Sequence, residues 1–240
     1  MSELIPLEVL LGNPEKAAPQ LSPDGRRMAY LAPVNGVLNV WVGRVGEDDY
    51  QPVTHDTERG IGAYAWAHNN RHLVYIQDQG GDENWRVHAV DLETGRTADL
   101  TPFEGVQARI EMMEKRHPNE LIVALNKDNS QLHDLYRLNL LSGELAKIAD
   151  NPGFIAWVVD YDLRARGALQ PTEEGGLNLL VRDSEEADWR QFVQFPPDDA
   201  LFSAPLGFTR DGKAMYLRTS VDANAARLVR KERRRGRGAS

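Results

Sequence analysis

The 240-residue sequence predicts an all-β fold, a partial β-propeller of about four to five four-stranded antiparallel blades preceded by a short N-terminal helix. Two observations support this prediction. Short apolar runs alternate with polar residues and are bounded by turn residues, which is typical of half-buried strands. The same arrangement then returns at intervals in the mid-forties, a period that is typical of propeller blades.

The segment from Trp66 to Pro102 shows the repeating unit most clearly. Its expected strands are 73–76, 85–90 and 97–100, and a tight turn at 91–96 joins the last two. Three antiparallel strands alone are marginally stable in water, because their apolar face stays exposed. The unit therefore needs neighbours like itself.

Copies of the unit occur along the chain. Anchored on Gly25, Asn70, Asn119, Arg164 and Gly212, they are separated by 45, 49, 45 and 48 residues. The second part of the unit also repeats, as an alternating strand at 39–45, 84–92, 133–141 and 177–183. A β-sandwich with evenly spaced strands is the alternative, because sandwich strands also recur at short, regular intervals.

In chain order, the first expected element is a short helix at 5–12, which Pro14 and Pro19 end. The expected blades follow at 20–64, 65–111, 112–156 and 157–203, with a partial fifth blade from 204 that stops after one or two strands. An unfinished blade leaves the surface of its neighbour bare, so we expect the sequence to be part of a longer molecule. The predicted organisation is a lead-in, an incomplete propeller and a basic tail, at 1–19, 20–226 and 227–240.

Charge is unevenly distributed along the chain. The formal net charge is −8, whereas segment 227–240 holds seven basic residues and one acidic residue, a net charge of +6. The rest of the chain therefore carries −14, which argues against nucleic acid as the partner of the body. An Arg-rich end buries too little apolar surface to fold, so we expect a disordered tail or a wrong-frame extension. An arm that binds nucleic acid or a membrane surface is the alternative for the tail.

Composition excludes several other classes of protein. No run of 18 apolar residues is present, so we expect no membrane span. The N-terminus lacks a basic region and carries Glu3 and Glu8, unlike a secretory signal. The absence of cysteine excludes disulfides, thiolate nucleophiles and Cys-type zinc sites. We expect a cytoplasmic protein without a cofactor or metal.

Two stretches resemble a known family. The motif S-P-D-G-R-R-M-A-Y-L at 22–31, followed by N-V-W-V at 39–42, resembles the start of the propeller domain in the prolyl oligopeptidase family of serine peptidases. The stretch at 66–95, which contains G-D-E-N-W, is similar to the family's second blade, nearest to its acylaminoacyl-peptidase-like members. The resemblance spans residues 5–220, although TolB-like propellers share the S-P-D-G turn. It implies a propeller that covers an α/β-hydrolase domain, restricts access to small peptides and leaves catalysis to Ser, Asp and His of that domain.

The chain departs from this family pattern at the catalytic residues. A nucleophile elbow needs G-x-S-x-G, because small neighbours allow its strained turn. None of the serines lies in that motif; they are Ser2, Ser22, Ser130, Ser142, Ser184, Ser203, Ser220 and Ser240. The sequence also lacks an alternating βαβ region that would hold a triad. We therefore assign no catalytic residue and predict that the chain alone is inactive.

The loop around G-D-E-N-W supplies the candidate site residues. In the arrangement that the resemblance implies, Asp82, Glu83 and Asn84 form a loop that faces substrate. Asp78, Asp82 and Glu83 also make an oxygen-rich cluster, but the order of ligands in an EF-hand is not met. A tight hairpin with exposed acids is the simpler interpretation.

Histidines and tryptophans suggest structural roles. His68 and His72 flank a turn, which favours surface histidines over metal ligands. The adjacent pairs His55–Asp56 and His133–Asp134 point to opposite faces of a strand and form no dyad. We expect the tryptophans to pack between blades; they are Trp41, Trp66, Trp85, Trp157 and Trp189.

Three functions are compatible with the sequence. The first is the non-catalytic, substrate-gating propeller portion of a truncated prolyl-oligopeptidase-family peptidase, which passes short peptides to a missing α/β-hydrolase domain. The alternative is a stand-alone propeller like TolB or WD-repeat proteins, used as a scaffold for protein partners. The third is an unrecognised hydrolase or metal enzyme that acts through Asp78, Asp82 or Glu83.

Overall fold

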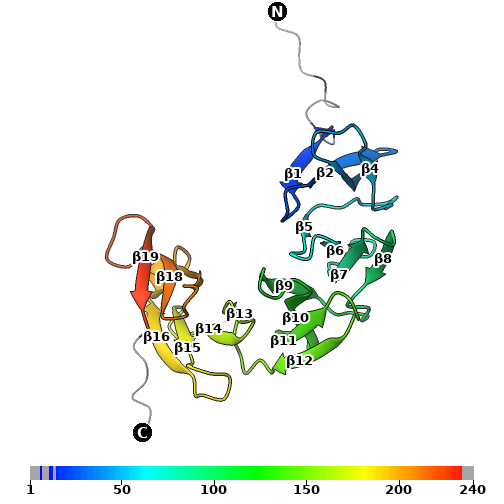
Figure 1. Cartoon of the computed structure of the whole chain (residues 1–240). Helices are drawn as coiled ribbons and strands as arrows, with labels where there is room; N and C mark the ends of the chain where they lie inside the picture. The colour runs from blue at the N-terminus through cyan, green and yellow to red at the C-terminus, as the bar shows by residue number, and fades with distance from the viewer. Residues whose placement is uncertain (1–5, 7–10, 13–14, 234–240) are drawn as a thin grey trace, which may run out of the picture. The chain divides into compact units, whose positions relative to one another are not determined.

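The computed structural model describes residues 6, 11–12 and 15–233 of the chain, and these are almost entirely β-structure (Figure 1). The chain divides into two compact units, 1–109 and 110–240, each of which is described by itself. In every sheet, each strand lies beside the next one along the chain. Such a meander is a propeller blade, and the predicted all-β propeller fold is confirmed.

The first unit contains two four-stranded sheets, which we call blades one and two. Blade one consists of β1 (Ala17–Leu21), β2 (Arg27–Val34), β3 (Val37–Arg44) and β4 (Gln51–Pro52). Blade two consists of β5 (Tyr64–Trp66), β6 (His72–Gln77), β7 (Arg86–Asp91) and β8 (Arg96–Asp99). Between β4 and β5 the chain runs through a long connection at 53–63.

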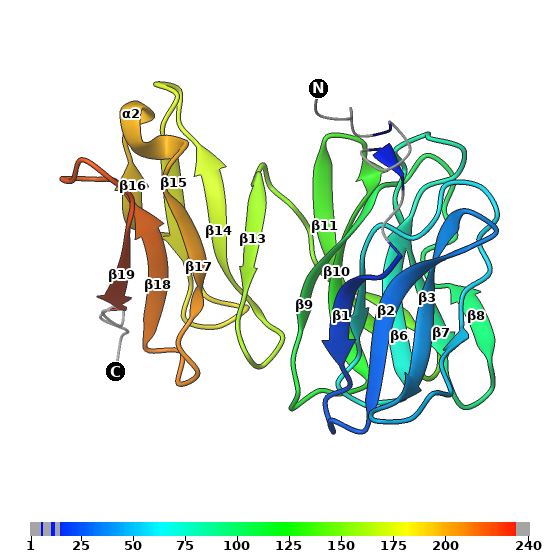
Figure 2. The ribbon, with the colours of Figure 1, turned by 90° about the horizontal axis from the view of Figure 1, so that it is seen from above.

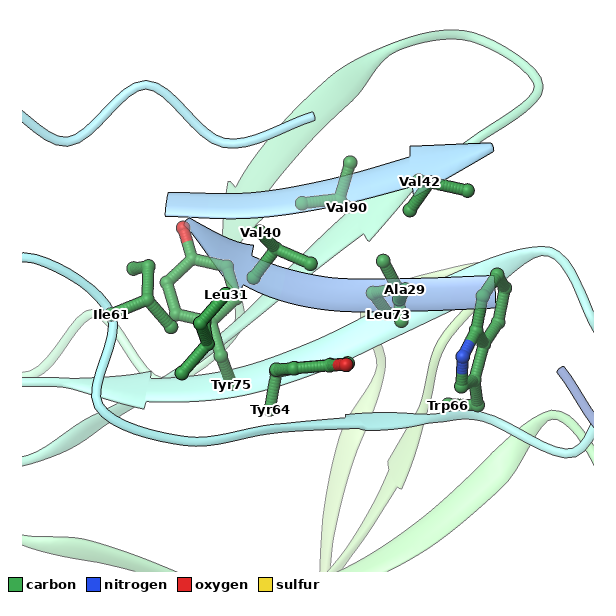
Figure 3. Packing of buried hydrophobic residues seen from close by; sticks show 10 residues of the cluster. All are labelled: Ala29, Leu31, Val40, Val42, Ile61, Tyr64, Trp66, Leu73, Tyr75 and Val90. Atoms are coloured by element: carbon green, nitrogen blue, oxygen red, sulfur yellow. The ribbon is translucent and has the colours of Figure 1, made fainter. Parts of the chain in front are cut away.

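A hydrophobic core joins these two blades (Figure 3). Every second residue of a strand contributes to it, as the two-residue period requires. Blade one provides residues of β2 and β3, blade two provides residues of β5, β6 and β7, and the connection adds Ile61; the members are Ala29, Leu31, Val40, Val42, Ile61, Tyr64, Trp66, Leu73, Tyr75 and Val90. Trp66 thus packs between blades, as predicted for the tryptophans.

The second unit contains three sheets, which we call blades three, four and five. Blade five has three strands, whereas the other two have four. Blade three consists of β9 (Ala108–Met113, which begins at the unit boundary), β10 (Glu120–Asn129), β11 (Leu132–Asn139) and β12 (Leu145–Ala149). Blade four consists of β13 (Ala156–Val159), β14 (Ala165–Pro171), β15 (Leu177–Val181) and β16 (Arg190–Phe195). After the short helix α2 (Pro197–Ala200), blade five consists of β17 (Ala204–Phe208), β18 (Ala214–Thr219) and β19 (Arg227–Glu232), which lie side by side (Figure 2).

Two further cores stabilise the second unit. One joins blades three and four and includes Ile122, Trp157 and Leu163, with Trp189 packed against it. The rings of Trp157 and Trp189 both contact Phe154, with centroid distances of 5.1 Å for each. The other core joins blades four and five and includes Phe195, Phe208 and Met215. Each blade therefore buries its apolar face against a neighbour within the unit.

The polar turn from the first to the second strand has one geometry in four blades. Its fourth residue has a positive φ, at Gly25 (71°), Asn70 (59°), Leu163 (58°) and Gly212 (64°). In each turn, the N–H of this residue donates to the carbonyl oxygen three residues earlier, at 2.8, 3.2, 3.0 and 2.8 Å. Glycine and asparagine favour this left-handed conformation, which explains why the repeat is visible in the sequence. We call this end of a blade its turn end, and the end where the second strand leads to the third its loop end.

The structure corrects three details of the sequence prediction. The anchor in blade four is Leu163 rather than Arg164. The sheets begin at 17, 64, 108, 156 and 204, whereas the sequence placed the blade starts at 20, 65, 112, 157 and 204. Blade five has three strands rather than one or two.

The predicted disordered tail at 227–240 is wrong for its first part. Residues Arg227–Glu232 form β19, which pairs with β18 in an unbroken antiparallel register. The sequence did not indicate this strand because most of its residues are basic. Its pairing with β18 is formed by the backbone, which does not require apolar side chains on both faces. Residues 234–240 lie outside the described residues, as does most of the predicted helix at 5–12.

Candidate functional site

The loop end of blade two contains a polar cleft of about 300 Å³, which we call the loop-end cleft. One wall is the connection between β4 and β5, which contributes Asp56 and Arg59. The opposite wall is formed by the end of β6 and the start of β7, which contribute Asp78, Arg86 and His88. Period-2 alternation explains why Arg86 and His88 share a face of the sheet.

An ion pair with a buried carboxylate fixes the connection to the loop after β6. Arg59 Nη1 lies 2.7 Å from Asp78 Oδ2, and the Asp78 side chain is only 3% exposed whereas that of Arg59 is 50% exposed. The N–H of Glu83 also donates to Asp78 Oδ2, at 3.3 Å. Gly81 makes room for the pair, since a Cβ there would lie 2.9 Å from Arg59 Nη1. Asp78 therefore organises the loop rather than offering a free carboxylate.

The inner wall of the loop-end cleft holds a neutral imidazole. His88 stacks on Tyr75, with ring centroids 5.1 Å apart and planes inclined by 15°. Burial lowers the pKa of His88, although the charge of Asp99 opposes this effect. Burial likewise raises the pKa of Tyr75 to about 12. Both rings are thus uncharged at neutral pH, and His88 has one nitrogen that donates and one that accepts a hydrogen bond.

Arg86 provides the second guanidinium of the loop-end cleft. Its Nη1 lies 3.4 Å from Asp99 Oδ2, which is a long contact for an ion pair. Its Nε is buried and has no hydrogen-bond partner among the residues that the structure describes. The cleft therefore offers guanidinium donors and a neutral imidazole beside the carboxylates of Asp56, Glu58 and Asp78, a mixture of donors and acceptors that suits the carbonyl and amide groups of a peptide.

The predicted residues Asp82, Glu83 and Asn84 lie in the loop beside the cleft and do not line it. Asp82 accepts hydrogen bonds from the N–H of Gln79 at 3.2 Å and from the N–H of Asn84 at 3.0 Å. Hydrogen bonds from Asn84 lower the pKa of the Asp82 carboxyl, which stays charged and exposed. These residues shape the loop, and Glu83 has a φ of 58°.

Sequence reasoning missed Arg59, Arg86 and His88. Arg59 lies in a connection without a recognisable motif, and its pairing with Asp78 spans 19 positions. The available signal was the alternation of β7, which places Arg86, His88 and Val90 on one face. It did not indicate which face would border a cleft.

The other polar candidates have structural roles. His72, which the sequence predicted at the surface, is instead buried, and its Nδ1 lies 2.9 Å from Asn69 Nδ2. Asp134 lies 2.8 Å from Lys147 Nζ, and the carbonyl oxygen of His133 accepts a hydrogen bond from Trp157 Nε1. His55 is exposed. Over residues 15–233 and the few described before them, no group of three or more His, Cys, Asp and Glu side chains is placed to hold a metal ion.

Ser22 and Ser203 make structural hydrogen bonds. Ser22 Oγ donates to Asp24 Oδ1 at 2.6 Å and accepts from the N–H of Arg27 at 2.9 Å. Ser203 Oγ donates to Thr219 Oγ1 at 3.1 Å.

Helices in the described part of the chain are all too short or too polar to cross a membrane.

Comparison with known proteins shows similarity to peptidases. No family model matches the chain. Dipeptidyl aminopeptidase BIII of Pseudoxanthomonas mexicana is 38% identical over 229 residues, which are 95% of this chain and 33% of that protein. The chain spans about a third of the length of the curated relatives it matches.

Solved structures show the same fold. A prolyl endopeptidase structure aligns with a TM-score of 0.62 and 12% identity over 90% of this chain and 35% of that one. The β-propeller domain of the Trilobed protease from Pyrococcus furiosus aligns with a TM-score of 0.55 and 15% identity, over 93% of this chain and 70% of that one.

Proposed function

Because the chain is a β-propeller of the kind found in the prolyl oligopeptidase family, and nearly all of it matches a dipeptidyl aminopeptidase, we propose that it is the substrate-gating propeller portion of such a peptidase. The observation that carries the proposal is the coverage, since 95% of this chain matches 33% of the relative. Hydrolysis of short peptides then belongs to the part of the relative that this chain does not match.

Gating in this proposal is steric. Propeller blades surround a central channel, and their tightly packed cores resist local opening. An extended peptide is narrow enough for such a channel, whereas a folded protein is not. The propeller thereby selects substrates by size and conformation, and its own side chains need not take part in bond cleavage.

The loop-end cleft is where we propose that the propeller contacts a passing peptide. Arg59 and Arg86 provide donors for peptide carbonyl groups, and the neutral His88 can accept from a peptide N–H. The loop that contains Asp82, Glu83 and Asn84 borders the cleft and limits the approach of larger ligands. What supports this assignment is that Arg86 lines the cleft, is paired with Asp99 only at 3.4 Å, and has an Nε without a hydrogen-bond partner in the described part of the chain.

A chimaeric enzyme tests the proposed function. We would replace the matching third of the Pseudoxanthomonas mexicana enzyme with this chain and compare cleavage of a dipeptidyl nitroanilide with cleavage of a folded protein. We expect hydrolysis of the small substrate only. A folded chimaera that degrades the folded protein equally well would contradict gating, and a folded but inactive chimaera would favour the scaffold function.

Variants of the cleft refine the test. In the active chimaera, Arg86→Gln should raise KM for short peptides several-fold and leave kcat unchanged, because it removes binding that is equal in ground state and transition state. Arg44→Gln, at an exposed ion pair in blade one, is the matched control. An unchanged KM in Arg86→Gln would remove the loop-end cleft from the substrate path without affecting the gating proposal.

A further inference from the structure

Four arginines gather at the turn ends of blades four and five, and we call them the arginine cluster. Arg166 lies in β14, Arg182 follows β15, Arg190 begins β16 and Arg233 follows β19. The carbonyl oxygen of Arg182 joins two of them, since it accepts from Arg166 Nε at 3.2 Å and from Arg233 Nη2 at 2.9 Å. These hydrogen bonds to a shared carbonyl oxygen hold Arg166 and Arg233 in fixed positions beside Arg182.

Carboxylates lie beside all four arginines, but three of the arginines share two of them. Arg166 Nη1 lies 3.3 Å from Asp160 Oδ2. A single oxygen of Asp183, Oδ1, lies 3.2 Å from Arg190 Nη2 and 2.7 Å from Arg233 Nη2. Three guanidinium groups thus share two carboxylates. The fourth, Arg182, interacts electrostatically with Glu185 and Glu186.

Two hydrogen-bond donors in the cluster lack acceptors. The Nε atoms of Arg190 and Arg233 are buried and have no partner among the described residues. The Arg233 side chain is only 4% exposed. A buried donor without a partner is costly, and native structures rarely retain one unless water or a ligand supplies the acceptor.

The surroundings of Arg233 also disfavour its positive charge. Its guanidinium and that of Arg166 both lie over the ring of Phe208, at 5.3 and 5.8 Å from the centroid, and this cation–π attraction offsets only part of the cost of burying them. Burial, reinforced by the positive charges of Arg166 and Arg190, lowers the pKa of Arg233 to about 10. An additional negative charge beside Arg233 would favour its charged form and raise its pKa again.

We propose that the arginine cluster binds a small oxyanion, which enters from solvent beside Arg190 and Asp183. These two side chains are 30% and 41% exposed, so they form the accessible edge of the cluster. Planar guanidinium groups match the geometry of phosphate and carboxylate oxygens, and an oxyanion supplies the acceptors that the two Nε atoms lack. The oxyanion is either a free phosphate or the carboxylate of a peptide, and the site is distinct from the loop-end cleft.

Ligand-dependent thermal unfolding tests this site. The purified full chain would be heated with increasing inorganic phosphate, or with the capped peptide acetyl-Ala-Glu-Ala-amide, against sodium chloride of equal ionic strength. We expect a saturable rise of Tm with at least one probe, because a ligand that binds the native state stabilises it. Phosphate alone would identify a phosphate site, and the peptide alone a carboxylate site.

Two variants separate the site from general salt effects. Arg190→Gln should weaken binding of the active probe about tenfold, whereas Arg230→Gln, which removes an equal charge from exposed β19, should leave it unchanged. Arg190→Lys keeps the charge but not the planar fork, and should also weaken binding if Arg190→Gln does not fold. The absence of stabilisation by both probes, or equal stabilisation of Arg190→Gln and Arg230→Gln, would overturn the proposal.

Discussion

At the turn end of blade two, one arginine is fully matched by carboxylates, whereas at the turn ends of blades four and five two arginines share one carboxylate oxygen. Arg71 donates to both oxygens of Asp91, at 2.8 and 2.6 Å, and also contacts Glu93 at 2.9 Å. In blade four, Arg190 has a single ion pair at 3.2 Å and a buried Nε without a partner in the described chain. The same end of a blade thus serves the fold in blade two and leaves binding capacity in blade four.

The turns themselves solve one backbone problem in two ways. Blade two places Asn70 at the left-handed position, and its Oδ1 accepts from the N–H of Asp24 in blade one at 2.9 Å. Blade four places Leu163 there, fully buried in the core between blades three and four. Packing offsets the steric cost of a left-handed leucine, whereas asparagine tolerates this conformation by itself.

The largest expected effect follows from this contrast between the turns. Leu163→Ala should destabilise the protein by about 3 kcal/mol, since it leaves a cavity in a closed core. Asn70→Ala should cost about 1 kcal/mol, because it removes one acceptor and a favourable left-handed residue. Urea unfolding of both variants measures the difference. Equal losses would show that burial of the Leu163 side chain contributes no more stability than the local hydrogen bond and conformation of Asn70.

Removal of the carboxylate in blade two should have the next largest effect. Asp91 accepts from Arg71, from the N–H of Glu93 at 3.0 Å and from Thr94 Oγ1 at 2.9 Å. Asp91→Ala should therefore cost about 2–3 kcal/mol. The control Asp48→Ala lies at an exposed position and should stay within about 0.5 kcal/mol of wild type. A similar loss in both variants would remove the special role of the blade-two pair.

The same pair predicts how stability depends on pH. Hydrogen bonds from Arg71 hold the pKa of Asp91 well below its usual range. The native state thus favours the charged carboxylate, and its contribution is present above the unfolded pKa of about 3.9 and is lost as the pH falls through the folded value. The difference in unfolding free energy between wild type and Asp91→Ala should shrink in acid. A constant difference down to about pH 3 would contradict this account of the pair.

The smallest expected effect compares the arginines directly. In buffer without phosphate, Arg71→Gln should lower Tm by about 3 °C, because Asp91 loses both of its charged hydrogen bonds. Arg190→Gln should change Tm by less than about 1 °C, since its single ion pair is offset by relief of positive charge. Differential scanning calorimetry measures both shifts. A larger loss in Arg190→Gln would assign the arginine cluster to the fold.

Much of the fold was predictable because backbone geometry selects residue types at the turns. Gly25, Asn70 and Gly212 all lie at left-handed positions, and this is why the blade repeat could be found. Leu163 was missed because no local preference favours leucine there, and only the core around it explains its presence. Strand β19 was missed for a similar reason, since its pairing with β18 is a tertiary property that the basic composition conceals.

The loop residues that the sequence predicted are not the residues that line the loop-end cleft. Asp82, Glu83 and Asn84 are recognisable as a local motif because they are adjacent in the sequence. In the structure, the Asp82 side chain makes hydrogen bonds within this loop. The residues that line the loop-end cleft come from a connection and from a strand, so their proximity depends on how the two blades pack. The arginine cluster likewise joins residues from β14, β16 and the end of β19. Sequence spacing carries no information about such contacts.

The most direct test of the central proposal, that this propeller selects substrates while hydrolysis takes place elsewhere, is to assay the purified chain by itself with a dipeptidyl nitroanilide. We expect no release of nitroaniline above buffer, together with hydrolysis once the chain is placed in the chimaeric enzyme. Turnover by the chain alone that co-purifies with it and disappears on unfolding would contradict the proposal and show that the propeller is itself a catalyst.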